Sequence, residues 1–308
     1  MELLVLNISK TTFIFFLLLG FSGSQASESN IEKLLDYEVF PINTLKQLEP
    51  SGLTFKDGQL FTVCDDNNQI FRLEFTDSAE MNAVIQQNLD LSQLAAMNLD
   101  MEGITVAEDE FFVVSEVHHK LVRVNGDQLK WVPDLGSVYR SAYEQGLFQL
   151  YNAGLEAATY LGKHTFLLAV ERQPRGLIEV KFNDDFSKIV QQTNQMFDDS
   201  THPLESSRKP DLTGLYVFEG RIFALHRNAY VIHELIKNEQ GQYQEGQSWS
   251  YEHIVKHPDY AYQDMMFGHA EGLAVDDTYF YLVLDNNGNP RLKNPNDNRP
   301  LLIRAKRK

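Results

Sequence analysis

Residues 102–116 read EGITVAEDEFFVVSE, and residues 271–285 read EGLAVDDTYFYLVLD. In both stretches a Glu-Gly pair starts a short apolar strand, polar residues mark a turn, and a second apolar strand ends in a carboxylate. The glycine and the final carboxylate are thirteen positions apart in each stretch. Variants of the same pattern occupy residues 51–65, 156–171 and 213–227. The sequence is therefore built on a repeated β-hairpin.

The spacing of the copies predicts the architecture. They start roughly fifty to sixty residues apart, which is typical of the four-stranded antiparallel blades of a propeller. We expect an all-β, five-bladed β-propeller, or a six-bladed one if one blade is degenerate, formed by residues 27–308 as a single domain. A strand at 301–304 should close the ring by pairing with a strand near 37–41. The stretches 137–152 and 250–264 are expected to form loops with short helices over one face.

The N-terminus has the pattern of a secretory signal peptide. Lys10 precedes the apolar run TFIFFLLLGF at 12–21, and Ser24-Gln25-Ala26 follows as a small-x-small cleavage site. We expect residues 1–26 to be removed, so that the mature protein is periplasmic or secreted. An uncleaved anchor helix is the alternative, although the apolar run is short for a membrane span.

Charge and cysteine content exclude several classes of function. The net charge of −16 repels phosphate backbones, so no nucleic-acid partner is expected. The single cysteine, Cys64, excludes an intramolecular disulfide and a multi-cysteine zinc site. Its apolar neighbours predict a buried thiol. We expect a monomer that has no stable membrane anchor after signal cleavage and that acts on a small-molecule or anionic ester substrate.

Acidic residues recur at two positions of the repeat. The residue that starts each copy is Ser51, Glu102, Glu156, Thr213 or Glu271. The residue that ends each copy is Asp65, Glu116, Glu171, Arg227 or Asp285. The first strand of each blade should line a central channel, so these side chains should converge on its axis.

Converging carboxylates repel one another unless they hold a cation or accept hydrogen bonds. Oxygen ligands suit calcium or magnesium, and calcium (Ca2+) is the expected cofactor. An alternative is that the glutamates lie at solvated blade corners and cap backbone N–H groups. The expected metal ligands are Glu102, Glu156, Glu271, Asp65 and Asp285.

Other residues suggest catalytic roles. His269 precedes Glu271 by two positions, so it should lie at the same entrance and could transfer a proton. Arg172, Arg175 and Arg227 could hold an anionic substrate. The expected catalytic set is His269, Glu271, Arg172 and Arg227. A surface or hydrogen-bonding role is expected for three further histidines, His118, His119 and His226.

The repeat motifs together carry a family resemblance. They are SGLTF with CDD, DMEGITV with SE, NAGLEAATY with LLAVER, DLTGLYV with FALHR, and HAEGLAV with LVLDNNG, and they cover residues 49–289. The chain resembles the phytase-like ("esterase-like activity of phytase") β-propeller family and, more distantly, the SdiA-regulated propellers.

The resemblance implies a propeller with an acidic, calcium-compatible centre and hydrolysis of esters or phosphoesters. Two positions depart from the family pattern, because Ala157 replaces a glycine and His226-Arg227 replaces an acidic-basic pair. The site residues that the resemblance implies are Glu102, Glu156, Glu271, Glu171, Arg172 and Asp285.

Three functions remain open from the sequence. The first is a calcium-dependent hydrolase of ester or phosphoester bonds. The second is a non-catalytic propeller that binds a ligand or protein. The third is a lactonase-like enzyme with a calcium ion in the channel.

Overall fold

The computed structural model describes residues 31–205, 207–266 and 268–307. The expected signal peptide, residues 1–26, lies outside this range. Within the described residues, none of the helices has the length and apolar character needed to cross a bilayer.

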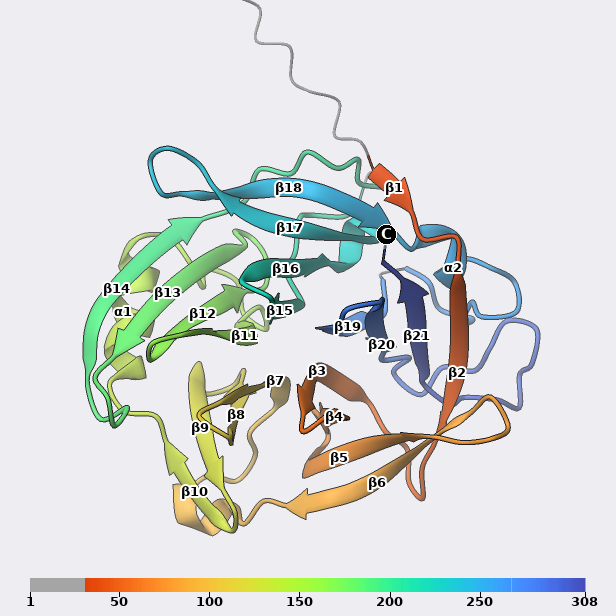
Figure 1. The fold of residues 1–308 in the computed structure, drawn as a ribbon, viewed down its shortest axis with the longest axis horizontal. Helices are drawn as coiled ribbons and strands as arrows, with labels where there is room; N and C mark the ends of the chain where they lie inside the picture. The colour runs from red at the N-terminus through yellow and green to blue at the C-terminus, as the bar shows by residue number, and fades with distance from the viewer. Residues whose placement is uncertain (1–30, 206, 267, 308) are drawn as a thin grey trace, which may run out of the picture.

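The chain is all-β, and its strands form several antiparallel four-stranded units arranged around a common centre (Figure 1). One sheet contains β7 (Met101–Ala107), β8 (Glu110–Ser115), β9 (Lys120–Asn125) and β10 (Gln128–Trp131). A second contains β11 (Leu155–Gly162), β12 (Thr165–Val170), β13 (Gly176–Phe182) and β14 (Ile189–Met196). A third contains β15 (Gly214–Phe218), β16 (Arg221–His226), β17 (Val231–Lys237) and β18 (Tyr243–Ser250), with β1 (Ile31–Lys33) added parallel to β18.

The remaining strands form one eight-stranded sheet. One half contains β3 (Pro50–Lys56), β4 (Gln59–Cys64), β5 (Asn67–Phe75) and β6 (Met81–Asn88). The other half contains β19 (Ala270–Val275), β20 (Tyr279–Leu284), β21 (Leu301–Lys306) and β2 (Tyr37–Asn43). A short parallel pairing of β2 with β6 joins the halves. The pairing pattern therefore gives four sheets rather than five separate ones, and the number of blades stays a prediction.

The predicted ring closure is confirmed. Strand β2 pairs antiparallel with β21, from Tyr37 opposite Ala305 to Pro41 opposite Leu301. A strand near the N-terminus thus completes a unit whose other three strands come from the end of the chain. This closure leaves few exposed sheet edges between the two ends of the ring.

The first strands of the units surround the centre and pack tightly. Strands β3, β7, β11, β15 and β19 contact one another in a closed cycle. A Cβ atom on Gly103 would lie 2.8 Å from the Glu156 carbonyl oxygen, and one on Gly272 would lie 2.6 Å from the Gly52 carbonyl carbon. The glycines of the repeat are therefore required because neighbouring backbones approach too closely for a side chain.

This packing corrects the expectation of a central channel. The axis between the first strands holds a cavity of only about 10 Å3, whose lining includes Gly52, Gly103, Ala157 and Gly214. The axis is filled by backbone and small side chains. An acidic site must therefore lie at one end of the ring rather than along its length.

Apolar side chains fill the spaces between neighbouring sheets. The Phe112 and Phe166 rings pack 4.9 Å apart between the β7–β10 and β11–β14 sheets, and the Trp249 and Phe280 rings pack 5.0 Å apart between β18 and β20. Cys64 is fully buried, as predicted, and burial raises the pKa of its thiol to about 11.

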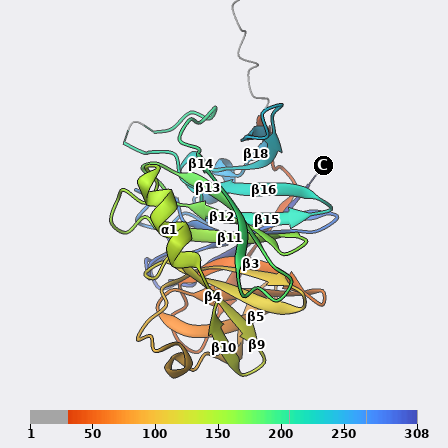
Figure 2. The same ribbon diagram turned by 90° about the vertical axis from the view of Figure 1, so that its left-hand side faces the viewer.

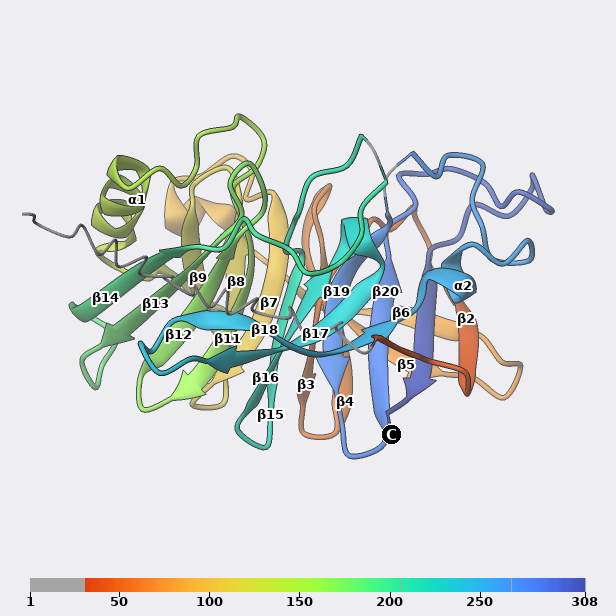
Figure 3. The same ribbon diagram turned by 90° about the horizontal axis from the view of Figure 1, so that it is seen from above.

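The predicted helices lie in the two expected stretches. These are helix α1 (Leu135–Glu144) and helix α2 (Glu252–Val255). The structure also contains two 3-10 turns, η1 (Leu91–Leu94) and η2 (Arg227–Ala229). The side view places α1 at one end of the β11–β14 sheet (Figure 2). Seen from above, α1 and α2 lie away from the turn that joins β15 to β16 (Figure 3). The longer connections therefore gather at one end of the ring.

Candidate functional site

A pocket of about 710 Å3 lies where the first strands of the units begin. Its lining contains every residue of the predicted metal and catalytic sets. These residues are Asp65, Glu102, Glu156, Arg172, Arg227, His269, Glu271 and Asp285. The predicted site residues therefore lie together around one pocket, and their roles stay predictions.

Hairpin geometry explains why both repeated positions meet here. The start of each first strand pairs with the end of the second, for example Met101 with Ser115 and Ala270 with Leu284. The two repeated positions therefore lie at the same edge of each unit, although they are fourteen residues apart in sequence, or fifteen in the third copy.

Three entrance glutamates lie at interruptions of the strand pairing. The register shifts between Met101 and Gly103, between Leu155 and Ala157, and between Ala270 and Gly272. The residues at these shifts are Glu102, Glu156 and Glu271. A β-bulge leaves one residue unpaired and redirects its side chain, which is a recurrent feature beside functional sites.

Arg227 is the centre of an ion-pair network in the pocket. Its Nε donates to Asp211 Oδ2 over 3.0 Å, its Nη2 donates to Glu171 Oε1 over 2.6 Å, and its Nη1 donates to Glu271 Oε1. Burial opposes the charge, but the charges of Glu271 and Asp211 outweigh it and raise the pKa of Arg227 above its ordinary value. All three nitrogens of this guanidinium are therefore engaged by carboxylates.

The other two predicted arginines behave differently. Arg172 contacts Glu171 and donates to the Asn152 carbonyl over 2.9 Å, with a quarter of its side chain exposed. Arg175 lies outside the pocket lining and is fully buried, with Nη2 2.6 Å from Glu245 Oε1. The expectation that Arg175 contacts substrate is therefore wrong.

Two buried carboxylate oxygens are left open at the centre. Within the described residues, Glu171 Oε2 and Glu271 Oε2 have no hydrogen-bond partner. A buried oxygen without a partner is costly and calls for an explanation such as a bound ion. These oxygens fit a cation with oxygen ligands, which is the group that the acidic repeat predicts.

The carboxylates also cluster at ligand spacing. Three groups of three bring one oxygen from each residue within 4.8 Å of the others. The groups are Asp100, Glu102 and Glu116; Glu116, Glu156 and Glu171; and Glu49, Asp65 and Asp66. Each contains one predicted ligand, and Glu116 joins the first two groups.

Burial and mutual repulsion raise the pKa values of these acids. Desolvation raises the pKa of Asp65 to about 6 and that of Asp285 to about 8. For Glu102 and Glu156, burial followed by neighbouring carboxylates raises the pKa well above the ordinary value. Glu49, beside Asp65, has its pKa raised to about 7 by burial. Without a cation, several of these groups are therefore protonated near neutral pH.

His269 lies at the entrance, as predicted. Its Nε2 is 2.6 Å from the Asp264 carbonyl oxygen, so Nε2 carries the proton and donates it in a hydrogen bond. Burial lowers the pKa of its ring. A neutral ring with Nδ1 as its acceptor atom is suited to receive a proton.

Several pocket residues were missed because they lie in loops between the repeats. Lys209 and Asp264 line the pocket from such loops, and Asp211, which lies outside the lining, holds Arg227 from the loop after β14. Asp100 was detectable, because it precedes the Met-Glu-Gly stretch of the second copy by a single residue.

The three histidines expected at the surface or in hydrogen bonds lie in different environments. His118 is within hydrogen-bonding distance of Ser115 Oγ at 3.0 Å, and His119 stacks on Tyr139 with ring centroids 4.6 Å apart. His226 is fully buried rather than at the surface, and its Nδ1 lies within hydrogen-bonding distance of Arg175 Nη1, at 3.4 Å.

Comparisons with known proteins agree with the fold. A Myxococcus xanthus glutaminyl cyclase aligns with a TM-score of 0.50 at 10% identity, covering 87% of this chain and 93% of that one. A Xanthomonas campestris gluconolactonase aligns with a TM-score of 0.42 at 8% identity, covering 89% and 91%.

A virginiamycin B lyase from Staphylococcus aureus aligns with a TM-score of 0.40 at 10% identity, covering 83% of this chain. The chain spans 66% of that lyase, just under two thirds of its length. The comparison with curated proteins gave no match.

The family model gives the more specific result. The model described as SdiA-regulated matches residues 32–284, which includes four copies of the repeat and all but the last residue of the fifth. This is the more distant of the two expected resemblances, and the phytase-like resemblance is not confirmed. On this match, the chain belongs to the SdiA-regulated family.

Proposed function

We propose that this protein is an exported, five-bladed propeller that hydrolyses ester or phosphoester bonds of small anionic substrates with the help of a bound calcium ion. The observation that carries the proposal is the charge of the pocket. Eight carboxylates and three basic side chains line it, and two buried carboxylate oxygens have no partner within the described residues. The five-blade count treats the eight-stranded sheet as two units joined by the β2–β6 pairing.

The cation would be held by the two overlapping groups near the axis. Glu102, Glu116 and Glu156 supply oxygens from two neighbouring units, and Glu171 Oε2 is the open atom beside them. Calcium takes six to eight oxygen ligands in flexible geometry, so loosely arranged carboxylates suit it better than magnesium. When bound, such an ion polarises a phosphoryl or carbonyl oxygen.

The remaining residues divide into positioning and proton-transfer roles. Arg227 holds Glu271 and Glu171 in place, since its donors are already engaged by carboxylates. Arg172 and Lys209 are the cations with exposed surface in the pocket, so they are suited to bind an anionic substrate. Glu271 Oε2 and His269 Nδ1 are available to accept a proton from an attacking water.

A lactonase-like reaction is the second candidate. A lactone is a cyclic ester, so its hydrolysis needs the same proton acceptor and the same polarised carbonyl oxygen. The two candidates differ in the substrate rather than in the site.

The test is turnover with and without calcium. The purified protein, stripped of metal with a chelator, would be assayed on an aryl phosphate, an aryl acetate and a simple lactone. Calcium should restore hydrolysis of at least one of them, and Glu271→Gln should abolish it, whereas the exposed Glu239→Gln should not. If calcium binds but none of the three substrates is hydrolysed, the hydrolase proposal is wrong and a non-catalytic binding propeller is supported instead.

A further inference from the structure

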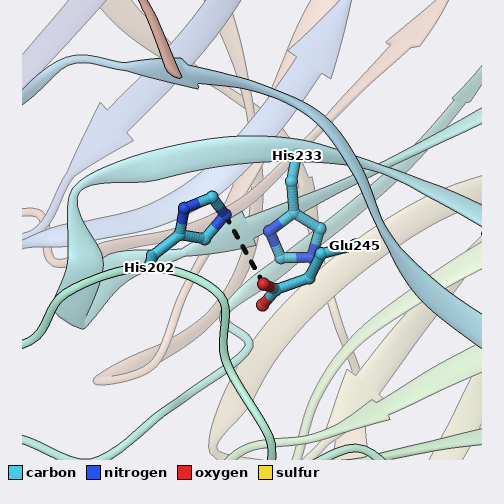
Figure 4. A group of neighbouring side chains, drawn as sticks. All are labelled: His202, His233 and Glu245. Atoms are coloured by element: carbon cyan, nitrogen blue, oxygen red, sulfur yellow. Dashed lines mark ion pairs between the residues drawn. The ribbon is translucent and has the colours of Figure 1, made fainter. Parts of the chain in front are cut away.

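A second group of potential ligands lies outside the pocket lining, in the interior of the β15–β18 sheet region. His202, His233 and Glu245 place one ligand atom each within 4.8 Å of the others (Figure 4). His233 lies on β17 and Glu245 on β18, while His202 comes from the loop that follows β14. Their side chains are almost inaccessible to solvent, with 0% exposure for His202 and 3% for Glu245.

Strand pairing brings two of these residues to one face. His233 is opposite Ser248, and Leu235 is opposite Glu245, with a register shift between these pairs. Residues 233 and 235 face the same side of a strand, so Glu245 lies on the same face as His233. The loop residue His202 completes the group, with Nε2 3.2 Å from Ser248 Oγ and 3.6 Å from Glu245 Oε2.

The histidines have polar atoms that nothing in the described residues satisfies. Both ring nitrogens of His233 and Nδ1 of His202 are buried without a hydrogen-bond partner. Leaving a buried polar atom without a partner costs about 1–3 kcal/mol, so native proteins rarely keep several in one place. A ligand bound among the three side chains would explain one nitrogen of His233, whereas His202 faces Glu245 with Nε2 rather than with Nδ1 (Figure 4).

The donor set identifies the kind of ligand. Two imidazoles and one carboxylate form a common set for zinc, which binds nitrogen and oxygen at about 2.0–2.2 Å. Calcium and magnesium prefer oxygen atoms alone. The His202 and His233 rings are stacked with centroids 5.9 Å apart, and one nitrogen of each lies within 4.8 Å of the other and of a Glu245 oxygen.

The surroundings orient the carboxylate. Arg175 Nη2 donates to Glu245 Oε1 over 2.6 Å, and the Thr201 N–H donates to Oε2 over 2.7 Å. Hydrogen bonds of this kind fix ligand orientation around metal sites.

The positive charge of Arg175 works against a cation, so the binding energy must come from bonds to nitrogen. The two imidazole ligands therefore favour a zinc-class metal over calcium.

We propose that His202, His233 and Glu245 bind one zinc-class divalent transition-metal ion. The ion ties the loop residue His202 to strands β17 and β18. Ser207 and Lys209 of the same loop line the acidic pocket, so the ion also fixes one wall of that pocket. The third nearby histidine, His226, has its ring centroid 6.3 Å from that of His233. Zinc binding at this place does not depend on the proposed hydrolase.

Zinc content provides the first test. The full chain, without an affinity tag, would be stripped with a chelator, incubated with zinc chloride, dialysed and analysed for metal. Wild type should retain one zinc per chain, and zinc should raise its Tm. His202→Asn should weaken binding by at least about tenfold and abolish the Tm rise. His257→Asn, which removes an exposed histidine, should behave as wild type.

The position of the ion provides the second test and needs no variant. Anomalous diffraction at the zinc edge from wild-type crystals soaked in zinc should place the ion between His202, His233 and Glu245. Zinc found only among the pocket carboxylates or on exposed histidines would overturn the proposal. So would retention of zinc by His202→Asn at the wild-type level, or no retained zinc in wild type.

Discussion

Arg227 Nη2 lies 2.6 Å from Glu171 Oε1, which links the end of the β15–β16 hairpin to the end of the β11–β12 hairpin. Similar contacts extend from the same guanidinium to Asp211 and Glu271. One cation thus holds carboxylates from neighbouring units of the ring. It replaces, in the fourth copy, the carboxylate that the other four copies place at this position.

Arg227→Gln should destabilise the protein strongly. The change leaves three buried carboxylates without their cation, and breaking a buried ion pair costs about 3–5 kcal/mol. Urea denaturation without calcium would measure the loss. Arg221→Gln is the matched control, because its pair with Glu234 is partly exposed and should be worth at most about 1 kcal/mol. Equal losses for the two variants would contradict the central role of Arg227.

Stability without calcium should fall as the pH rises through roughly 4 to 8. Burial raises the pKa of Asp65 to about 6 and of Asp285 to about 8, so the folded protein binds protons that the unfolded chain has released. The stabilising protons are all present below the unfolded pKa of about 3.9 and are lost as the pH passes the folded value. Thermal unfolding at several pH values, in the presence of a chelator, measures this trend.

Calcium should reverse that trend. The ion competes with protons for the same oxygens, so its stabilising effect should be larger at pH 8 than at pH 5. The difference in Tm with and without calcium, measured at both pH values, checks this. A calcium effect that does not change with pH would argue against binding by the acids with raised pKa values.

Glu102→Gln should separate repulsion from ligation. The amide removes one buried carboxylate from a crowded group, so the calcium-free protein should be at least as stable as wild type at pH 8. The calcium-bound form should lose affinity by tenfold or more, since a ligand is gone. Calorimetric titration and Tm measurements give both quantities. Glu239→Gln, at an exposed position, should change neither.

Gly103→Ala should destabilise the ring through the close approach of its first strands. The added Cβ would lie 2.8 Å from the Glu156 carbonyl oxygen and 3.1 Å from the Ala157 Cα, so backbone must move. Overpacking of this kind costs about 1–3 kcal/mol. In Gly136→Ala, on α1, the Cβ meets open space, and a gain of about 0.5–1 kcal/mol is expected. Denaturation of both variants tests the pair.

Most of the fold, and most of the residues that line the pocket, could be predicted from the repeat, and the reason is physical. A hairpin of constant length returns its two ends to one edge, so the fourteen-residue spacing of Glu102 and Glu116 was enough to bring them together. Antiparallel closure of β2 on β21 followed from the incomplete last copy. The filled axis could not be predicted, because the sequence does not show how closely the backbones of neighbouring first strands approach one another at the glycines.

Residues outside the repeat could not be placed from sequence. Asp211 holds Arg227 from a loop whose path depends on tertiary packing. His202, His233 and Glu245 are separated by up to 43 positions and meet only through a loop and a register shift. No local spacing indicated them, since metal-binding motifs are recognised from short sequence intervals.

The location of bound calcium tests the central claim most directly. In a crystal structure of the protein grown with millimolar calcium, we expect an ion at about 2.3–2.6 Å from carboxylate oxygens of Glu102, Glu116 and Glu156 at the end of the ring. A pocket that holds only water at that concentration, or calcium bound solely to exposed acids, would contradict the account.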